Sequence, residues 1–526
     1  MPEGQCFVGK ASSVRGLCLT LALAFAIVLS GCSNRTERAY EEAQRAEAFV
    51  QQGDLWSARQ AIARALEYRD DQVDLLLLDA RIKYLMQDLR QAYEGYRVVL
   101  AFDPANPEAL QAVALLGLTT GNDQESRDAV EKILAADPGQ SDALLVKGVH
   151  ALNRKDYEEA LAVGETILSH APDDTRGIVL KARATSLMGD SDEALTLLRD
   201  TATRIGNNDM IATALLETAR DQANAPVMLE QLALLRRDRP DSIDLAIDEA
   251  NVRYKSEDVA GARSVGAEIL ARHGDDAAAM DRLGELWLEY DRDPLSPNDR
   301  ARLASQGQID ARIAAARHYF RIGDFAVAET LLESLEDDRA AGLRARIGLA
   351  AGEPGAAREA SAIVERDTTN CDALAARALS HLRRGDARAA VVDAQVVAAE
   401  CLDRGDGFLL LAQAYDALEQ PAGVERAYSE GVTRHPQDRI LSTAYVEWLF
   451  EQDRSQAAVS TARRLTQLAP AKVSSWRLLA SACARAGDEV CGEIARSGEA
   501  RAVRNFAMDL PPGRRAVNPL LGQSWR

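Results

Sequence analysis

A step of 34 residues recurs along this chain of 526 residues. The positions that mark it are Pro104, Pro138, Pro172, Gly206, Pro240 and Gly274. Because the whole sequence holds 34 glycines and 16 prolines, about a tenth of its residues, six consecutive matches are not expected by chance. The same step separates Pro436 from Pro470 near the end of the chain. A fixed period of this length indicates a tandem repeat rather than a series of unrelated globular domains.

Within one period the pattern is that of a helical hairpin. In residues 141–174, Leu144, Gly148 and Ala151 share one helical face, and a second amphipathic run from Tyr157 ends before Pro172. We expect small side chains at Gly148 and at Ala160 to let the two helices approach closely. A Gly-Asp pair recurs at the expected turn, where glycine supplies a positive φ and aspartate caps the second helix. The pairs are Gly53-Asp54, Gly189-Asp190, Gly323-Asp324, Gly385-Asp386 and Gly487-Asp488.

A helical hairpin of 34 residues resembles the tetratricopeptide repeat (TPR). The resemblance covers roughly residues 39–505 and implies an all-α, right-handed superhelical solenoid of about fourteen hairpins with a concave groove. We expect an N-terminal array over 39–276, an irregular repeat with a bend over 277–308 and a C-terminal array over 309–505. Residues 506–526 contain adjacent prolines and no helical period, which predicts an extended or disordered tail.

The N-terminus has the pattern of an export signal. An uncharged run from Leu17 to Leu29 follows Lys10 and Arg15, and it is too short to cross a membrane as a helix. The segment 29-LSGC-32 resembles the bacterial lipobox, which implies cleavage between Gly31 and Cys32 and lipidation of Cys32. Residues 1–31 would then be a removed signal peptide and 32–38 a lipid-anchored linker. Since Ser33 is not aspartate, the resemblance implies an outer-membrane protein that faces the periplasm.

Charge and motif content exclude several function classes. The chain has 62 Lys and Arg against 81 Asp and Glu, a net charge of −19, which argues against nucleic-acid binding. Its six histidines never stand in pairs at metal-ligand spacing, and the phosphate-binding and hydrolase motifs are missing from the sequence. We therefore predict a protein that is not an enzyme, with no cofactor, no metal and no small-molecule substrate.

Four cysteines follow the signal and Cys32, namely Cys371, Cys401, Cys483 and Cys491. An even number in an oxidising compartment indicates pairing, and the hairpin prediction favours Cys371–Cys401 and Cys483–Cys491. Antiparallel helices would bring the first pair together at a hairpin end, and the second pair would face each other across the turn at Gly487. Four buried free thiols are the alternative that the sequence leaves open.

The tetratricopeptide resemblance places partner contacts in the groove, on the first helix of each hairpin. The candidate contact residues are Arg81 and Tyr84 in the N-terminal array and Arg317, Phe320 and Arg321 in the C-terminal array. The second group would suit an acidic or aromatic partner, and an ordinary solvated helix face is the alternative.

The overall pattern is similar to TPR lipoproteins of exopolysaccharide and exosortase systems, which implies an envelope scaffold that binds proteins. The alternatives are a polysaccharide-binding export factor and a lipoprotein for pilus or outer-membrane-protein assembly. An aromatic content of 5% favours protein over polysaccharide as the ligand.

Overall fold

The computed structural model describes residues 35–401, 405–436 and 438–506. Within these ranges the chain is an all-α solenoid of paired helices and contains no strand, as predicted. The predicted signal peptide, Gly31, Cys32 and all of the predicted tail except Phe506 lie outside the described residues. The chain divides into two compact units, with the boundary between Gly206 and Asn207.

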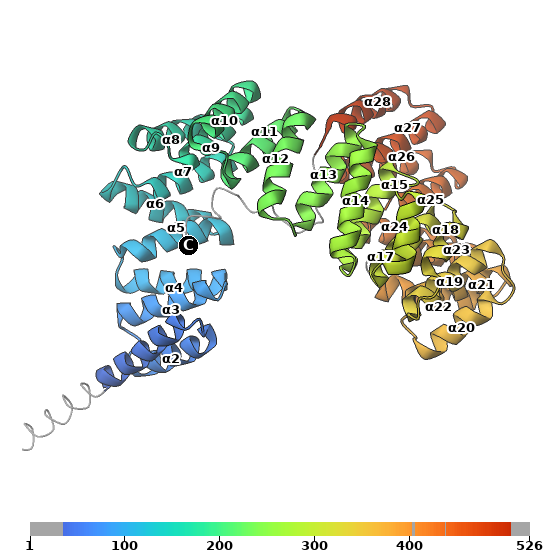
Figure 1. Cartoon of the computed structure of the whole chain (residues 1–526), viewed down its shortest axis with the longest axis horizontal. Coiled ribbons are helices and arrows are strands. Elements are labelled where there is room, and N and C mark those ends of the chain that lie inside the picture. The colour runs from blue at the N-terminus through green and yellow to red at the C-terminus, as the bar shows by residue number, and fades with distance from the viewer. Residues whose placement is uncertain (1–34, 402–404, 437, 507–526) are drawn as a thin grey trace, which may run out of the picture. The chain divides into compact units, whose positions relative to one another are not determined.

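Unit 1, described over residues 35–206, consists of five helical hairpins (Figure 1). Its first helix covers residues 35–51. The others are α2 (Leu55–Tyr68), α3 (Val73–Leu85), α4 (Leu89–Phe102), α5 (Pro107–Thr120), α6 (Asp123–Ala136), α7 (Ser141–Asn153), α8 (Tyr157–His170), α9 (Thr175–Met188) and α10 (Ser191–Ile205). Because residues 35–38 are already helical, they belong to the first hairpin and not to the linker predicted over 32–38. Arg69 ties this first turn to α2 by donating a hydrogen bond of 2.6 Å to Thr36.

Unit 2, described over residues 207–506 apart from 402–404 and 437, continues the pattern with nine hairpins. The first six are α11 (Asp209–Asp221) with α12 (Ala225–Asp238), α13 (Ile243–Lys255) with α14 (Val259–His273), α15 (Ala277–Tyr290) with α16 (Pro297–Gln306), α17 (Ile309–Arg321) with α18 (Phe325–Leu332), α19 (Asp338–Ala351) with α20 (Ala356–Arg366), and α21 (Cys371–Arg383) with α22 (Ala387–Glu400). The last three are α23 (Asp406–Asp416) with α24 (Pro421–Arg434), α25 (Arg439–Glu451) with α26 (Ser455–Leu468), and α27 (Val473–Ala486) with α28 (Glu489–Arg504).

The turn inside each hairpin follows the predicted chemistry. The glycine of every predicted Gly-Asp turn has a positive φ, between 68° and 109°. The aspartate then accepts a hydrogen bond from a backbone N–H in the first turn of the second helix at Asp54, Asp324, Asp386 and Asp488, whereas Asp190 makes no such bond. Where glycine is missing, residues such as Lys155 and Ala223 take the same left-handed conformation, with φ of 63° and 54°. The hairpin geometry therefore imposes this backbone conformation whatever the residue.

Gly148 makes room for the next hairpin. A Cβ atom at this position would collide with Leu180 of α9, the first helix of the next hairpin. The expectation that Gly148 also brings α7 close to its own second helix stays a prediction. Ala160 of α8 is fully buried.

The apolar core extends along each unit in overlapping clusters. In unit 2, one cluster extends from Ala246 to Ile347, a second from Ala345 to Leu410 and a third from Ala398 to Ala495. Consecutive clusters share helices, so each hairpin is stabilised by its neighbours, as expected of a repeat array.

The irregular hairpin α15–α16 lies inside the first of these clusters. Leu295 and Leu303 are buried in it, and Asp291 accepts hydrogen bonds of 2.7 and 2.9 Å from Arg263 of the preceding hairpin. The division between compact units falls after Gly206, and the bend predicted over residues 277–308 stays a prediction. The aspartates of the loop anchor this segment to its neighbours and keep the core continuous.

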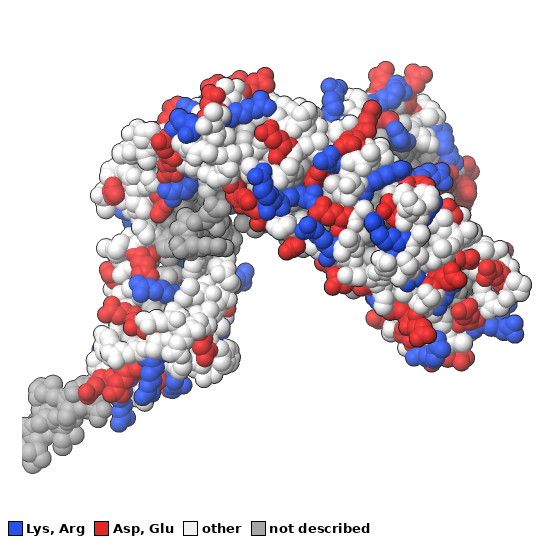
Figure 2. Space-filling view, in the orientation of Figure 1, with Lys and Arg blue, Asp and Glu red and all other residues white. Residues whose placement is uncertain are grey.

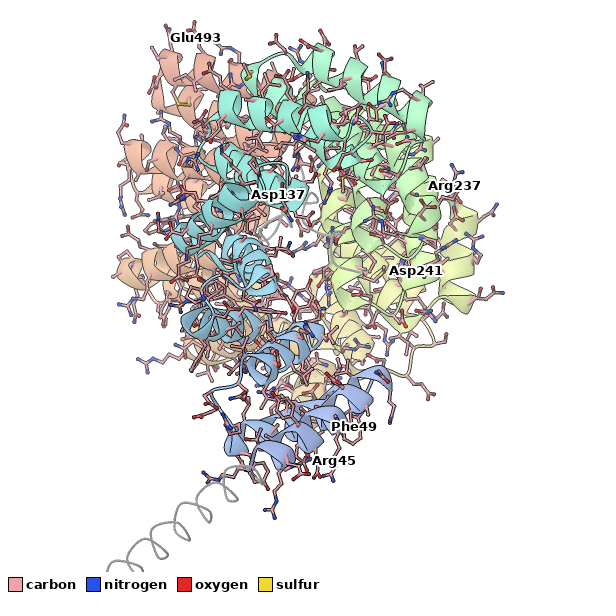
Figure 3. All side chains as sticks on the ribbon, turned by 90° about the vertical axis from the view of Figure 1, so that its left-hand side faces the viewer. Arg45, Phe49, Asp137, Arg237, Asp241 and Glu493 are labelled. Carbon is pink, nitrogen blue, oxygen red and sulfur yellow. A yellow bond between two sulfur atoms is a disulfide. The ribbon has the colours of Figure 1, made fainter. Side chains whose placement is uncertain are left out.

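The outer surface of unit 2 is charged. Figure 2 shows Lys and Arg interspersed with Asp and Glu over its visible face. Arg237 of α12 and Glu493 of α28, both exposed, point outward in Figure 3. No helix among the described residues combines the length and the apolar character that a membrane crossing requires.

Candidate functional site

The candidate site is the face formed by the first helices of the hairpins, named here the first-helix face. In unit 2 these helices are the odd-numbered ones, and from α13 onward each contacts the next: α15 contacts α17, and α19 contacts α21. Charged side chains pair between them. Some of these pairs skip a hairpin, as Arg317 of α17 and Asp372 of α21 do. Side chains of alternate hairpins meet in this way where the face that carries them is concave.

In unit 1 the predicted residues Arg81 and Tyr84 lie on α3. Arg81 forms a two-pronged ion pair with Glu108 of α5, and this hydrogen bonding raises the pKa of the guanidinium. Tyr84 is half-buried against the core of unit 1, and burial raises the pKa of its hydroxyl. Arg81 therefore joins two consecutive hairpins through their first helices.

In unit 2 both predicted arginines of α17 hold carboxylate partners. Arg317 lies 3.3 Å from Asp372 and 3.7 Å from Asp281, and Arg321 lies 2.9 Å from Glu285. Their side chains are 23% and 19% exposed. The predicted cluster is thus present, and its cations are already neutralised by neighbouring hairpins.

Phe320, the third predicted residue of α17, lies between a cation and a second ring. The guanidinium carbon of Arg346 lies 5.1 Å from its ring centroid, a cation–π distance, and the ring of Phe325 lies 5.9 Å away. The guanidinium therefore covers one face of this aromatic ring.

Three residues that were not predicted from the sequence, Arg346, Asp372 and Asp406, connect the charged side chains of the first helices. Arg346 of α19 lies 2.9 Å from Asp372 and 2.7 Å from Asp406, so it bridges α21 and α23. Asp372 is 4% exposed and accepts from both Arg346 and Arg317. Together with Glu285, Arg317 and Arg321, these three residues form what is named here the first-helix charge cluster. A sequence signal existed, because Asp372 and Asp406 stand 34 residues apart at equivalent positions of their hairpins.

The charge balance around this cluster is acidic. Burial lowers the pKa of Arg321, but the nearby carboxylates of Asp406 and Glu285 raise it by more, so the arginine stays charged. Burial raises the pKa of Asp438, which caps α25 and lies close to Arg321. Five carboxylates (Asp281, Glu285, Asp372, Asp406 and Asp438) thus surround three arginines. This balance favours a cationic or alternately charged partner over the acidic partner expected from the sequence.

Both predicted cysteine pairings are present as disulfides. Cys371 and Cys401 join the start of α21 to the end of α22, with Cα atoms 6.1 Å apart. Cys483 and Cys491 join α27 to α28 across their turn, with Cα atoms 5.6 Å apart. Both bonds therefore lie within single hairpins of unit 2.

One pair of a serine and a histidine in unit 1 lies in the core. Ser126 and His150 lie 2.7 Å apart, but both are buried, and burial lowers the pKa of the histidine. A buried pair of this kind links helices and is closed to substrate. Among the described residues, groups of three or more His, Cys, Asp or Glu that could hold a metal ion are absent.

Comparison with known proteins returns likeness in solved structures alone. No family model and no curated protein matches the chain. A tetratricopeptide repeat protein from Parabacteroides merdae ATCC 43184 is 15% identical, covers 48% of this chain and 99% of its own, and gives a TM-score of 0.42. PilW, a type IV pilus biogenesis factor, is 22% identical over 39% of this chain and 96% of its own, with a TM-score of 0.34. PilF of Pseudomonas aeruginosa is 18% identical over 40% of this chain and 96% of its own, with a TM-score of 0.32. At TM-scores this low, no function is carried over from these proteins.

Proposed function

We propose that this chain is a non-enzymatic scaffold that binds protein partners of the bacterial cell envelope along its first-helix face. The observation that carries the proposal is the first-helix charge cluster, which presents charges of both signs from five consecutive hairpins of unit 2. A polypeptide with spaced charges matches such a surface, because each partner charge can replace one of the internal pairs.

Two aromatic contacts favour a protein ligand over an exported polysaccharide. Sugar rings bind to open aromatic faces, and here arginine covers one face of each of two rings. Arg346 lies over Phe320, and the guanidinium carbon of Arg485 lies 4.1 Å from the ring centroid of Phe450. Both rings belong to first helices, α17 and α25.

The two disulfides support a location outside the cytoplasm. Disulfides persist in oxidising compartments and are rare where glutathione and thioredoxin keep thiols reduced. We infer that the chain is exported and held at the outer membrane by lipids on Cys32, with its solenoid in the periplasm. Lipid anchoring of a soluble solenoid fits a protein that acts by holding its partners at one place.

The anchor is tested with Cys32→Ala. The variant is expected to fold with both disulfides and to leave the membrane fraction, whereas the parent chain stays in it. Mass spectrometry of the mature N-terminus would show acyl chains on the parent alone. Full membrane retention of Cys32→Ala would rule out this mode of anchoring.

The partner class is tested with a photo-crosslinking amino acid placed in the full chain in living cells. Gln413, exposed on α23 of the first-helix face, is the test position, and Arg237, which points outward from α12, is the matched control (Figure 3). A protein crosslink from position 413 and none from position 237 is expected. No protein product at position 413, together with binding of purified surface polysaccharide, would favour the polysaccharide-binding alternative instead.

A further inference from the structure

Unit 2 makes contacts between segments that lie far apart in the sequence. Glu289 of α15 accepts a hydrogen bond of 3.0 Å from the backbone N–H of Ser474, in the first turn of α27, and another from its hydroxyl. Lys255, the last residue of α13, donates hydrogen bonds to the backbone carbonyl of Ala471, just before α27, and to two backbone carbonyls at the end of α28. In Figure 1, α13 and α15 lie beside α26–α28, in agreement with these bonds.

Glu289 supplies a helix cap from a distant hairpin. The first N–H groups of an α-helix have no partner within the helix, and a negative charge there is stabilised by the helix dipole. The residue at the N-cap position of α27 is Lys472, whose side chain makes no capping bond. The carboxylate of Glu289 takes this role for Ser474, although 185 residues separate the two in sequence.

Lys255 serves the same end of the last hairpin, where α28 finishes beside the start of α27. Its ammonium donates to the carbonyl oxygens of Ala471 at 2.8 Å, Ala502 at 3.1 Å and Asn505. A positive charge is favourable at a helix C-terminus, and an ammonium group carries three donors that can serve three oxygens. Residues 207–516 contain a single other lysine, Lys472, while arginines are frequent there. The planar guanidinium of arginine matches a carboxylate and does not match three converging carbonyls.

We propose that Lys255 and Glu289 form a latch that closes the hairpins from α13 to α28 into one turn. The two residues join α13 and α15 to the last hairpin, α27–α28, and this junction is named here the seam. The seam is bridged by polar contacts, whereas neighbouring hairpins share apolar clusters. The cluster that contains α13 and α15 shares no helix with the cluster that contains α27 and α28, whereas consecutive clusters share helices. Polar contacts exchange with water at low cost, so the seam opens while each hairpin keeps its core.

Hydrogen exchange at the amide of Ser474 measures the latch directly. This N–H is in the first turn of α27, so its protection depends on Glu289 and not on the helix. In the full chain, Glu289→Met is expected to speed its exchange by about tenfold or more, because a bond to a charged acceptor is lost. Glu493→Met, which removes an exposed carboxylate that points outward from α28 (Figure 3), is the control and should leave it unchanged.

The deciding variant is Lys255→Met. Lys255 does not touch Ser474, so faster exchange of the Ser474 amide in this variant shows that the two contacts open together as one latch. Lys255→Arg is expected to speed the exchange less than Lys255→Met does, because the planar guanidinium fits the three converging carbonyls less well than the ammonium. Unchanged Ser474 exchange in Lys255→Met, with α27 and α28 still protected, would reduce the two contacts to separate local bonds and overturn the proposal.

Discussion

Asp372→Asn is the perturbation that tests most directly whether the first-helix charge cluster holds hairpins together. The substitution keeps the shape and one acceptor oxygen but removes the charge that faces Arg346 at 2.9 Å and Arg317 at 3.3 Å. Breaking a buried pair costs about 3–5 kcal/mol. The arginines are 15% and 23% exposed and keep Asp406 and Asp281 as partners, so we expect a smaller loss, about 2–3 kcal/mol.

The assay is local, because a repeat array does not unfold in one step and a single free energy of unfolding is poorly defined for it. Hydrogen exchange of the amides in α17, α19 and α21 gives the free energy of opening at those helices. Asp281→Asn is the control: its carboxylate is 45% exposed and 3.7 Å from Arg317, so its loss should cost below about 1 kcal/mol. Equal effects of the two substitutions would show that burial of Asp372 does not strengthen its ion pairs, and would refute the reasoning.

Three further predictions concern the frame of the solenoid. Ala223→Gly relieves a left-handed backbone conformation at φ 54° and should raise the opening free energy of α11 and α12 by about 0.5–1 kcal/mol, measured by exchange; no gain would mean that the turn is unstrained. Replacing Cys371 and Cys401 with serine should destabilise the α21–α22 hairpin by about 1 kcal/mol more than the same change at Cys483 and Cys491 destabilises the α27–α28 hairpin, because the closed loops span 30 and 8 residues. Urea denaturation followed by local exchange shows which of the two hairpins loses more stability. Burial lowers the pKa of His318, which faces Asp291, Asp293 and Arg321, so the unfolded chain takes up a proton first as the pH falls below about 6.5 and stability is lost. His318→Gln should therefore flatten the fall in stability from pH 7 to pH 5 by up to about 1.4 kcal/mol per pH unit, and an unchanged slope would contradict this sign.

The hairpins were predictable because each depends on residues close together in sequence. The expected unit over 141–174 is present as α7 and α8, with the turn at Lys155 between them. Apolar periodicity, the aspartate cap and a closing proline act within one hairpin, so a single sequence window contains them. At Gly148 a single sequence window is not enough, because the side chain that leaves no room for a Cβ atom is Leu180 of the next hairpin.

The candidate site was predicted in position but not in chemistry. Arg317, Phe320 and Arg321 lie on the first-helix face as expected, yet their partners come from other hairpins. Arg317 and Asp372 are 55 residues apart and Arg346 and Asp406 are 60 apart, so each pair skips a hairpin. Helical periodicity shows which residues share a face, while the curvature of the array decides which of them meet.

The seam closed by Lys255 and Glu289 depends on still longer range. Each hairpin turns by a small amount relative to the last, so the position of α27 opposite α15 is the sum of every step between them. One of these steps is unusual: α18 has 8 residues where α4, α6 and α8 have 14 each, and α19 begins 29 residues after α17 begins, at Asp338 after Ile309. A short second helix changes the packing angle between neighbouring hairpins and hence the rotation from one hairpin to the next. Restoring α18 to full length would leave the individual hairpins intact and still move Ser474 away from Glu289, because the displacement is passed on through every later hairpin. The contact that closes unit 2 is therefore a property of the whole run of hairpins, which is why no single repeat of the sequence contains a signal for it.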